Sequence, residues 1–302
     1  MNTRSKGMFL VIFGVFLMSF ESLIIKATKS DIFSITMYFG FFLALSSFLI
    51  SLKNGLNTAK NSFFIEKTAL FTAAFCMAFA NFFFFYSVKY IGITITVLIY
   101  ATCPILTAIL ESIIYKTKVG KMLYATSLII IFGLFIAIKD NIKFDEMLNI
   151  FFCLIGLICF SIIYIILSNK KQVDRRSVIT LCGLMLFFFA LPFANIKINL
   201  QDFCLLFFMG FFLTSISRLA IGYGAMFILG AEVTLICVLE SILAPIWGHI
   251  ILGEIVNLNM IIGGAISIFA IIFYISMKAR YKISYQQIPS INQNKDKKLK
   301  RK

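Results

Sequence analysis

Two charged side chains, Glu240 and Arg218, lie in stretches of the sequence that are otherwise mostly apolar. Glu240 is in LESILAPIWGHIILGE at 239–254, and Arg218 is in LTSISRLAIGYG at 213–224. An ionised group at the centre of a lipid bilayer costs roughly a few kcal/mol, so such groups usually face one another or a water-filled cavity and take part in binding. We therefore take both as candidate substrate-binding residues, with a purely structural ion pair as the alternative.

Further polar residues accompany these two. Glu21, in the first apolar stretch, is expected either to line a cavity or to pair structurally. Glu232 precedes Glu240 by about 12 Å along a helix and about 80° around it, so the two acids fit one broad polar face, unless Glu232 reaches the membrane surface. Arg218 is the expected partner of either. If such a site couples to protons, Glu240 and then Glu232 are the candidate coupling residues. Hydrogen-bonding cavity residues are expected among Asn81, Tyr86, Tyr100, Tyr164 and Tyr223, some of which will serve in packing instead.

Pro104 and Pro245 are candidate hinges. Each proline removes a backbone donor inside an apolar stretch, which loosens one helical turn. Membrane helices tolerate this and use it either as a hinge beside a cavity or as a simple packing kink.

Three other polar or aromatic residues are expected to pack, cap or pair with nearby residues. Trp247 is expected to be a packing or interface aromatic, and Glu254 is expected to cap or pair locally at a helix end. Glu111 is expected to pair with Lys116 or Lys118.

The elements that must position these residues are membrane-spanning helices. Hydrophobic residues make up 61% of the chain and charged residues only 14%, far from the usual balance of a soluble domain. A bilayer core needs about 20 apolar residues per helix. The sequence thus predicts an all-α polytopic membrane protein with ten transmembrane helices, at about 8–27, 32–52, 68–88, 92–115, 119–138, 148–168, 177–194, 203–223, 230–252 and 258–277.

Basic residues gather in alternate loops, which predicts that both termini are cytoplasmic. The net charge of +15 lies at these membrane edges, so it indicates contact with lipid headgroups and no nucleic-acid binding. Residues 279–302 are rich in Lys and are predicted to form a disordered cytoplasmic tail. The expected location is the cytoplasmic (inner) membrane.

The two halves resemble each other weakly. At a shift of 137 residues, 85–88 (FYSV) at the end of one predicted helix correspond to 222–225 (GYGA) at the end of another, and at a shift of 138, Gly92 and Thr96 correspond to Gly230 and Thr234. Two five-helix repeats, 1–143 and 144–278, must enter the membrane from opposite sides because five is odd. Inverted repeats of this kind are a construction principle of secondary transporters.

The passage FFFFYSVKYIGITITVLIYATCPILTAIL at 82–110, the stretch at 239–254 and the following LNMIIGGAISIFAIIF together resemble the EamA-type branch of the drug/metabolite transporter (DMT) superfamily. The resemblance implies two inverted halves around a central cavity and transport by alternating access, with amino-acid, nucleotide-related and drug-like solutes in the family. This chain departs from the family pattern where a Gly-Glu pair is expected after 115 and where an arginine is expected in 35–45.

Rival classes have little support in the sequence. Seven cysteines without a C-x-x-C pair, a single histidine and the lack of a phosphate-binding loop argue against an enzyme, a metal site or a cofactor. A non-transporting membrane scaffold or partner subunit stays the alternative. Gly263, Gly264 and Ser267 suit close helix packing, either within the chain or in a homodimer. The expected partners are a small-molecule solute and membrane lipids.

Overall fold

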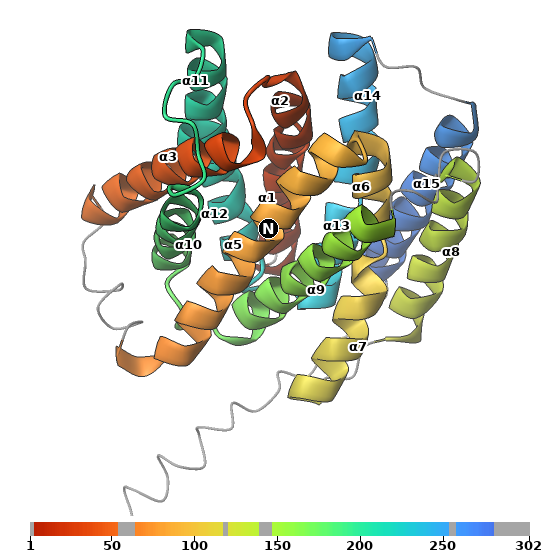
Figure 1. The fold of residues 1–302 in the computed structure, drawn as a ribbon. Coiled ribbons are helices and arrows are strands. Elements are labelled where there is room, and N and C mark those ends of the chain that lie inside the picture. The colour runs from red at the N-terminus through yellow and green to blue at the C-terminus, as the bar shows by residue number, and fades with distance from the viewer. Residues whose placement is uncertain (1–2, 54–63, 117–119, 139–146, 254–257, 281–302) are drawn as a thin grey trace, which may run out of the picture.

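The computed structural model describes residues 3–53, 64–116, 120–138, 147–253 and 258–280, and within these ranges the chain is helical with no strand (Figure 1). A helix satisfies its own backbone hydrogen bonds, which lipid cannot do. The elements are α1 (Thr3–Met18), α2 (Glu21–Ala27), α3 (Ile32–Lys53), α5 (Lys67–Tyr90), α6 (Ile93–Tyr100), α7 (Cys103–Tyr115), α8 (Lys121–Ile138), α9 (Met147–Asn169), α10 (Arg175–Ala190), α11 (Leu200–Phe207), the π-helix η2 (Phe208–Thr214), α12 (Ser215–Gly224), α13 (Gly230–Cys237), α14 (Glu240–Leu252) and α15 (Leu258–Arg280).

Six stretches of the described chain are long and apolar enough to cross a membrane: Thr3–Ala27, Ile32–Leu52, Lys67–Tyr90, Met147–Asn169, Leu200–Gly224 and Gly230–Leu252. Shorter apolar helices occur at Cys103–Tyr115, Lys121–Gly133 and Ile262–Tyr274. Helices occupy all ten predicted ranges, although the seventh ends early, at Ala190. The fold is that of a polytopic helical membrane protein, while the layout of ten spans in two repeats stays a prediction. The repeat boundary near 143 and the tail residues 281–302 lie outside the described residues, as does Glu254.

Three spans are interrupted. The first breaks at Ser19–Phe20, between α1 and α2; a second breaks at Ala101–Thr102, between α6 and α7; a third breaks at Val238–Leu239, between α13 and α14. A fourth span contains the π-helical turn η2 between α11 and α12. Non-helical backbone inside a membrane is tolerated where protein or a cavity surrounds it. These interruptions therefore mark the interior of the bundle as the place to look for a site.

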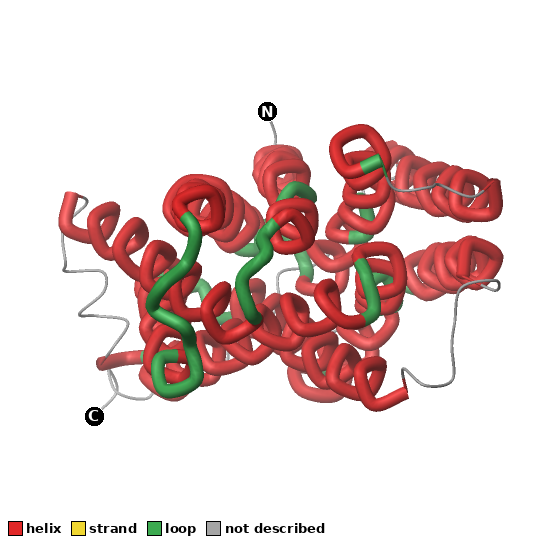
Figure 2. The backbone as a smooth tube through the Cα atoms, turned by 45° about the horizontal axis from the view of Figure 1, so that its top comes forward, coloured by secondary structure: helices red, strands yellow, loops and turns green. Residues whose placement is uncertain are grey.

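The helices pack in pairs. The closest pairs are α3 with α10, α5 with α9, α8 with α15 and α1 with α12. In Figure 1, α3 and α10 form one flank and α8 and α15 the other, and Figure 2 shows the interrupted helices between these flanks. At the crossing of α3 and α10 the backbones nearly touch, because a Cβ on Gly40 would lie 2.7 Å from the carbonyl oxygen of Gly183. Small residues permit such close approach in membrane bundles.

The buried apolar side chains form two clusters. The larger one joins α1, α3, α5, α9, α10 and α12, with Phe39 and Phe85 in edge-to-face contact at 4.8 Å. The smaller one joins α7, α8, α13 and α15. Helix α13 contributes side chains to both clusters, and α14 follows it in the same span.

Candidate functional site

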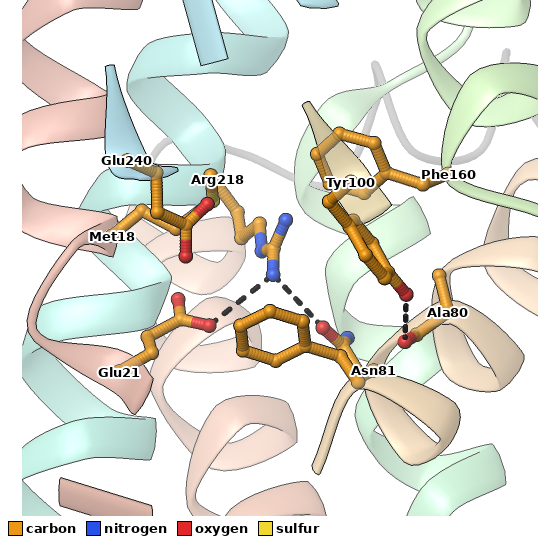
Figure 3. A pocket seen from close by; sticks show the side chains of 9 residues that line it. Met18, Glu21, Ala80, Asn81, Tyr100, Phe160, Arg218 and Glu240 are labelled. Atoms are coloured by element: carbon orange, nitrogen blue, oxygen red, sulfur yellow. Dashed lines mark hydrogen bonds and ion pairs between the residues drawn. The ribbon is translucent and has the colours of Figure 1, made fainter. Parts of the chain in front are cut away.

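A cavity with about 240 Å³ of empty space, part of it open to solvent, lies among the interrupted helices. Figure 3 shows its walls. The lining residues come from six segments of the chain and are Met18, Glu21, Ala80, Asn81, Phe84, Tyr100, Phe160, Arg218 and Glu240. Five of the residues predicted to bind a solute, Glu21, Asn81, Tyr100, Arg218 and Glu240, thus lie around one space.

Arg218 is the centre of this site. Its Nη2 lies 3.3 Å from Oε2 of Glu21 and donates a hydrogen bond of 2.9 Å to Oδ1 of Asn81. The side chains of Arg218 and Glu21 are 5% and 1% exposed. The hydroxyl of Tyr164, in α9, also lies close enough to interact with the guanidinium. A buried guanidinium held by one carboxylate and one amide is a fixed positive charge inside the bundle.

Several polar atoms in the cavity lack a partner within the described protein. Oε1 of Glu21 and Nε of Arg218 are buried and accept or donate no hydrogen bond. No hydrogen bond from a described residue reaches the carboxylate of Glu240, which is 8% exposed and interacts electrostatically with Arg218 and Glu21. Figure 3 shows both carboxylates on one side of the guanidinium. Buried polar groups normally have partners, so a polar ligand or water has a place here.

The interruptions of the spans position these groups. Glu21 begins α2 directly after the break at Ser19–Phe20, and Glu240 begins α14 directly after the break at Val238–Leu239. Arg218 follows η2, where the hydroxyl of Ser215 donates to the carbonyl of Gly210 at 2.9 Å. A π-helical turn holds an extra residue, which rotates the helix that follows it. The three charged side chains thus each come just after an irregular turn.

A second cavity, also with about 240 Å³ of empty space, adjoins the first. It shares Tyr100, Phe160 and Glu240 and adds Val97, Ala101, Cys237 and Ser241. The hydroxyl of Tyr100 donates to the carbonyl of Ala80 at 3.3 Å. Tyr100 and Phe160, in edge-to-face contact at 5.4 Å, form an aromatic partition between the two spaces.

The structure does not bring every candidate to these cavities. Tyr86 donates to Oδ1 of Asn149 at 3.0 Å, and Tyr223 is 37% exposed near the end of α12. Tyr164 is 2% exposed and packs against Phe160 behind the cavity wall. None of the three tyrosines lines either cavity.

The two prolines differ in their relation to the breaks. Pro104 is in the first turn of α7, directly after the break at Ala101–Thr102. Pro245 is inside α14, which continues through it, and the break of that span lies earlier, at Val238–Leu239. Pro104 therefore lies beside an interruption and Pro245 does not, and the hinge role of both prolines stays a prediction.

Glu232 has a partner that the sequence analysis does not name. Arg4 lies 2.7 Å from its Oε1, and the hydroxyl of Tyr274 donates to the same oxygen at 3.0 Å. Arg218 is expected from the sequence to pair with Glu232 or Glu240. Its ion pair is with Glu21 instead, and its interaction with Glu240 is electrostatic only. Arg4 is 228 positions from Glu232 in the sequence, so spacing along the chain does not indicate this pair.

Glu111 caps the start of α13. Its carboxylate accepts hydrogen bonds from the backbone N–H groups of Gly230 and Ala231, at 3.2 and 3.0 Å, and from the side-chain amide of Asn169 at 2.8 Å. A carboxylate at a helix N-terminus is favourable because it meets free N–H groups and the positive end of the helix dipole. The expected partner Lys118 lies outside the described residues.

Sequence reasoning missed the apolar walls of the site. Phe84 and Phe160 line the first cavity, and Cys237 and Ser241 line the second. Phe84 comes three residues after Asn81 and so shares its helix face. That spacing is the signal that would have identified it. Phe160 offers no such signal among so many phenylalanines.

A chain of apolar helices long enough to span a membrane, with a buried charged cluster between them, is a multi-pass membrane protein. Residues 5–139 match the EamA-like transporter family, which is part of the DMT superfamily. The match confirms the resemblance found in the sequence for this part of the chain, and the matched family is one of membrane transporters of the DMT type.

No curated protein matches the sequence. A solved structure described as "Crystal structure of protein" has a TM-score of 0.77 with this fold, at 12% sequence identity. The alignment covers 93% of this chain and 99% of the other. At this level of identity, the likeness shows a shared fold and nothing about the solute.

Proposed function

We propose that the protein is a secondary transporter that moves a small metabolite or drug-like solute, amino-acid-like or nucleotide-related, by alternating access of two inverted five-helix halves. The observation that carries this proposal is the buried cluster of Arg218, Glu21 and Glu240 around a cavity. Charged groups inside a membrane are costly and usually mark a solute or ion pathway. Binding sites near the middle of a membrane, at interrupted helices, are a recurring feature of secondary transporters.

The packing of the helices supports two related halves. Exchanging the halves puts α9 in the place of α1–α2, α10 in the place of α3, α12 in the place of α5 and α15 in the place of α8. This exchange maps each of the close pairs α3–α10 and α8–α15 onto itself. It maps the close pair α5–α9 onto the close pair α12–α1. Asn81 and Arg218, which are 137 residues apart, are equivalent at the shift of the predicted repeat and meet in one hydrogen bond. The same shift superposes the break at Ala101–Thr102 on the break at Val238–Leu239.

The charges around the cavity favour a solute that carries a positive group. Two acids and one arginine line the first cavity. Because Glu21 is paired with Arg218, Glu240 is the acid with room for a further cation. An ammonium group meets this requirement, and Tyr100, Phe84 and Phe160 suit an apolar or aromatic remainder. A proton on Glu240 would satisfy the same requirement, so exchange of a proton for the solute is the coupling we propose.

The size of the cavity fits a closed state of such a cycle. Ligand pockets usually enclose roughly 300–1,000 Å³, whereas the comparable volume of each cavity here is about 10 Å³, which is room for roughly one water molecule. A solute of the proposed class therefore requires the helices around Tyr100 and Phe160 to move apart. Alternating access supplies that movement.

The test is counterflow in proteoliposomes with a labelled panel of amino acids, amines, nucleosides and S-adenosylmethionine. Glu240→Gln is compared with Glu66→Gln, because Glu66 pairs with Lys170 outside the site. We expect saturable exchange of one solute class that Glu240→Gln abolishes and Glu66→Gln leaves intact. Exchange that both variants retain would contradict the site. A conductance that does not saturate would contradict a carrier.

A non-transporting scaffold is the alternative function. A scaffold predicts no exchange of any solute by a monodisperse protein, and equal behaviour of Glu240→Gln and the intact chain. The buried carboxyl group of Glu240, which accepts no hydrogen bond from a described residue, favours transport, because a scaffold gains nothing from a buried carboxyl group that costs free energy in the bilayer.

A further inference from the structure

Two hydrogen bonds join the first span to the span of Glu240, one on each side of the cavity. Nη2 of Arg4 donates to Oε1 of Glu232 at 2.7 Å, and Nε1 of Trp247 donates to Oγ of Ser19 at 3.0 Å. Both bonds connect residues that are 228 positions apart. The two spans therefore run parallel and in one register, with the two ties about 22 Å apart along the helices.

Trp247 is in direct contact with the break in the first span. Its ring stacks on Phe20, with ring centroids 4.8 Å apart and planes inclined by 17°, and meets Phe16 edge-to-face at 6.3 Å. Ser19, which accepts the indole N–H, also donates to the carbonyl of Phe16 at 2.7 Å. The tryptophan thus contacts both residues of the Ser19–Phe20 break.

This break sets the direction of Glu21. The backbone N–H of Phe20 bonds to the carbonyl of Leu17 at 3.3 Å, a tighter turn than that of the α-helix, and α2 then begins at Glu21. The orientation of α2 relative to α1 decides whether Oε2 of Glu21 reaches Arg218. The two groups are 3.3 Å apart, so a rotation at Phe20 that moves the carboxylate away from Arg218 would break the ion pair.

We propose that Trp247 is a positioning residue of the binding site: by holding Ser19 and Phe20 it fixes the break in the first span and keeps Glu21 against Arg218. Trp247 itself lines neither cavity. It acts on a solute only through Glu21. Arg4 and Glu232 hold the same two spans at the far end, so the register of the pair is fixed on both sides of the site. The positional claim stands on its own, and its effect on transport rests on the proposed function.

A double-mutant cycle in thermal unfolding tests the position of Glu21 without any solute. The cycle combines Trp247→Leu with Glu21→Asp, which retains the charge but withdraws the carboxylate by one methylene. If Trp247 holds Glu21 in place, Glu21→Asp lowers the unfolding midpoint clearly in the intact chain and much less in Trp247→Leu. Equal shifts in both backgrounds would overturn the proposal, because residues that act independently have additive effects.

Milder variants separate positioning from general packing. Trp247→Phe keeps an aromatic ring on Phe20 and removes the donor, and Ser19→Ala removes the acceptor. Trp247 is the single tryptophan of the chain, so its fluorescence emission reports on its surroundings in Ser19→Ala. We expect a shifted emission in Ser19→Ala, and in both variants a solute affinity that is about three- to tenfold weaker, as for the loss of one hydrogen bond, with unchanged monodispersity. An unchanged emission together with an unchanged affinity would contradict the role of the Ser19 contact.

The outcomes distinguish this inference from the proposed function. A coupled cycle in a protein that exchanges no solute would leave the positional role standing and remove the transport function. Transport that depends on Glu240 but proceeds equally well in Trp247→Leu would leave the transport function standing and remove the positional role of Trp247.

Discussion

Asn81 accepts a hydrogen bond of 2.9 Å from Arg218, and the two residues are 137 positions apart in the sequence. They belong to α5 and α12, which are equivalent under the predicted repeat. Equivalent residues of two halves related by a two-fold axis can touch only on that axis. The contact therefore supports an approximate axis through the cavity.

The amide of Asn81 should matter for stability as well as for the site. Replacing it in Asn81→Leu leaves the guanidinium of Arg218 without one acceptor, and a hydrogen bond to a charged group contributes about 1.5–3 kcal/mol. We expect a loss of this order in the free energy of unfolding in detergent. Asn81→Asp restores an acceptor and adds a negative charge, so it should recover stability and alter solute preference. Equal losses in both variants would argue against this hydrogen bond.

The crossing of α3 and α10 should not accept even one methyl group. In Gly40→Ala the new Cβ would lie 2.7–2.8 Å from three atoms of α10, and overpacking of this kind costs about 1–3 kcal/mol. Gly264→Ala, in α15, is the matched control because the nearest atom to its Cβ is 4.0 Å away. The unfolding midpoint should fall in the first variant and stay or rise slightly in the second. Similar midpoints for the two would be inconsistent with the described crossing.

Loss of the carboxylate of Glu111 should loosen the start of α13. Glu111→Ala removes the acceptor for the N–H groups of Gly230 and Ala231, and loss of a helix cap costs about 0.5–2 kcal/mol. Hydrogen exchange of those two amides, read by mass spectrometry of the peptide that contains them, should accelerate. Glu66→Ala, which removes an acid that pairs with Lys170, serves as the comparison and should leave that peptide unchanged.

Acidification should release the loop between α2 and α3. Although partial burial opposes it, hydrogen bonds from Ser34 and Asn195 hold the pKa of Asp31 below its ordinary value of 3.8. A carboxyl whose pKa is lowered in the folded state adds stability above 3.8, and this contribution is lost as the pH falls below that value. We expect the slope of unfolding midpoint against pH between about 5 and 3 to be smaller in Asp31→Asn than in the intact chain. Identical slopes would show that Asp31 does not contribute.

The sequence predicts the helices and the charged site better than it predicts the breaks. Apolar runs decide where helices occur, and the cost of charge in lipid singles out Glu21, Arg218 and Glu240, which the structure brings together. The break at Ser19–Phe20 has no proline or glycine to announce it. Its tertiary contacts are with Trp247, and local sequence does not report such contacts.

Partners across long sequence distances were also beyond reach from one sequence. The pair of Arg4 and Glu232 joins the N-terminal segment to the second half. From the sequence alone, an arginine near a terminus could pair with many acids. The packing of α1 beside α13 brings Arg4 to Glu232. Tyr86 and Tyr223 show the converse error, because a polar aromatic in an apolar run has no fixed direction until the helix is packed.

The two halves differ at the positions that meet in the middle. Where the second half has Arg218 and Glu240, the predicted equivalents in the first half are the neutral Asn81 and Cys103, and the thiol of Cys103 already bonds with Ser161 and Thr107. An inward-facing and an outward-facing state built from unlike halves are not mirror images. In the proposed cycle the solute would then be held with different affinity on the two sides of the membrane, and transport would reach half its maximal rate at different solute concentrations in the two directions.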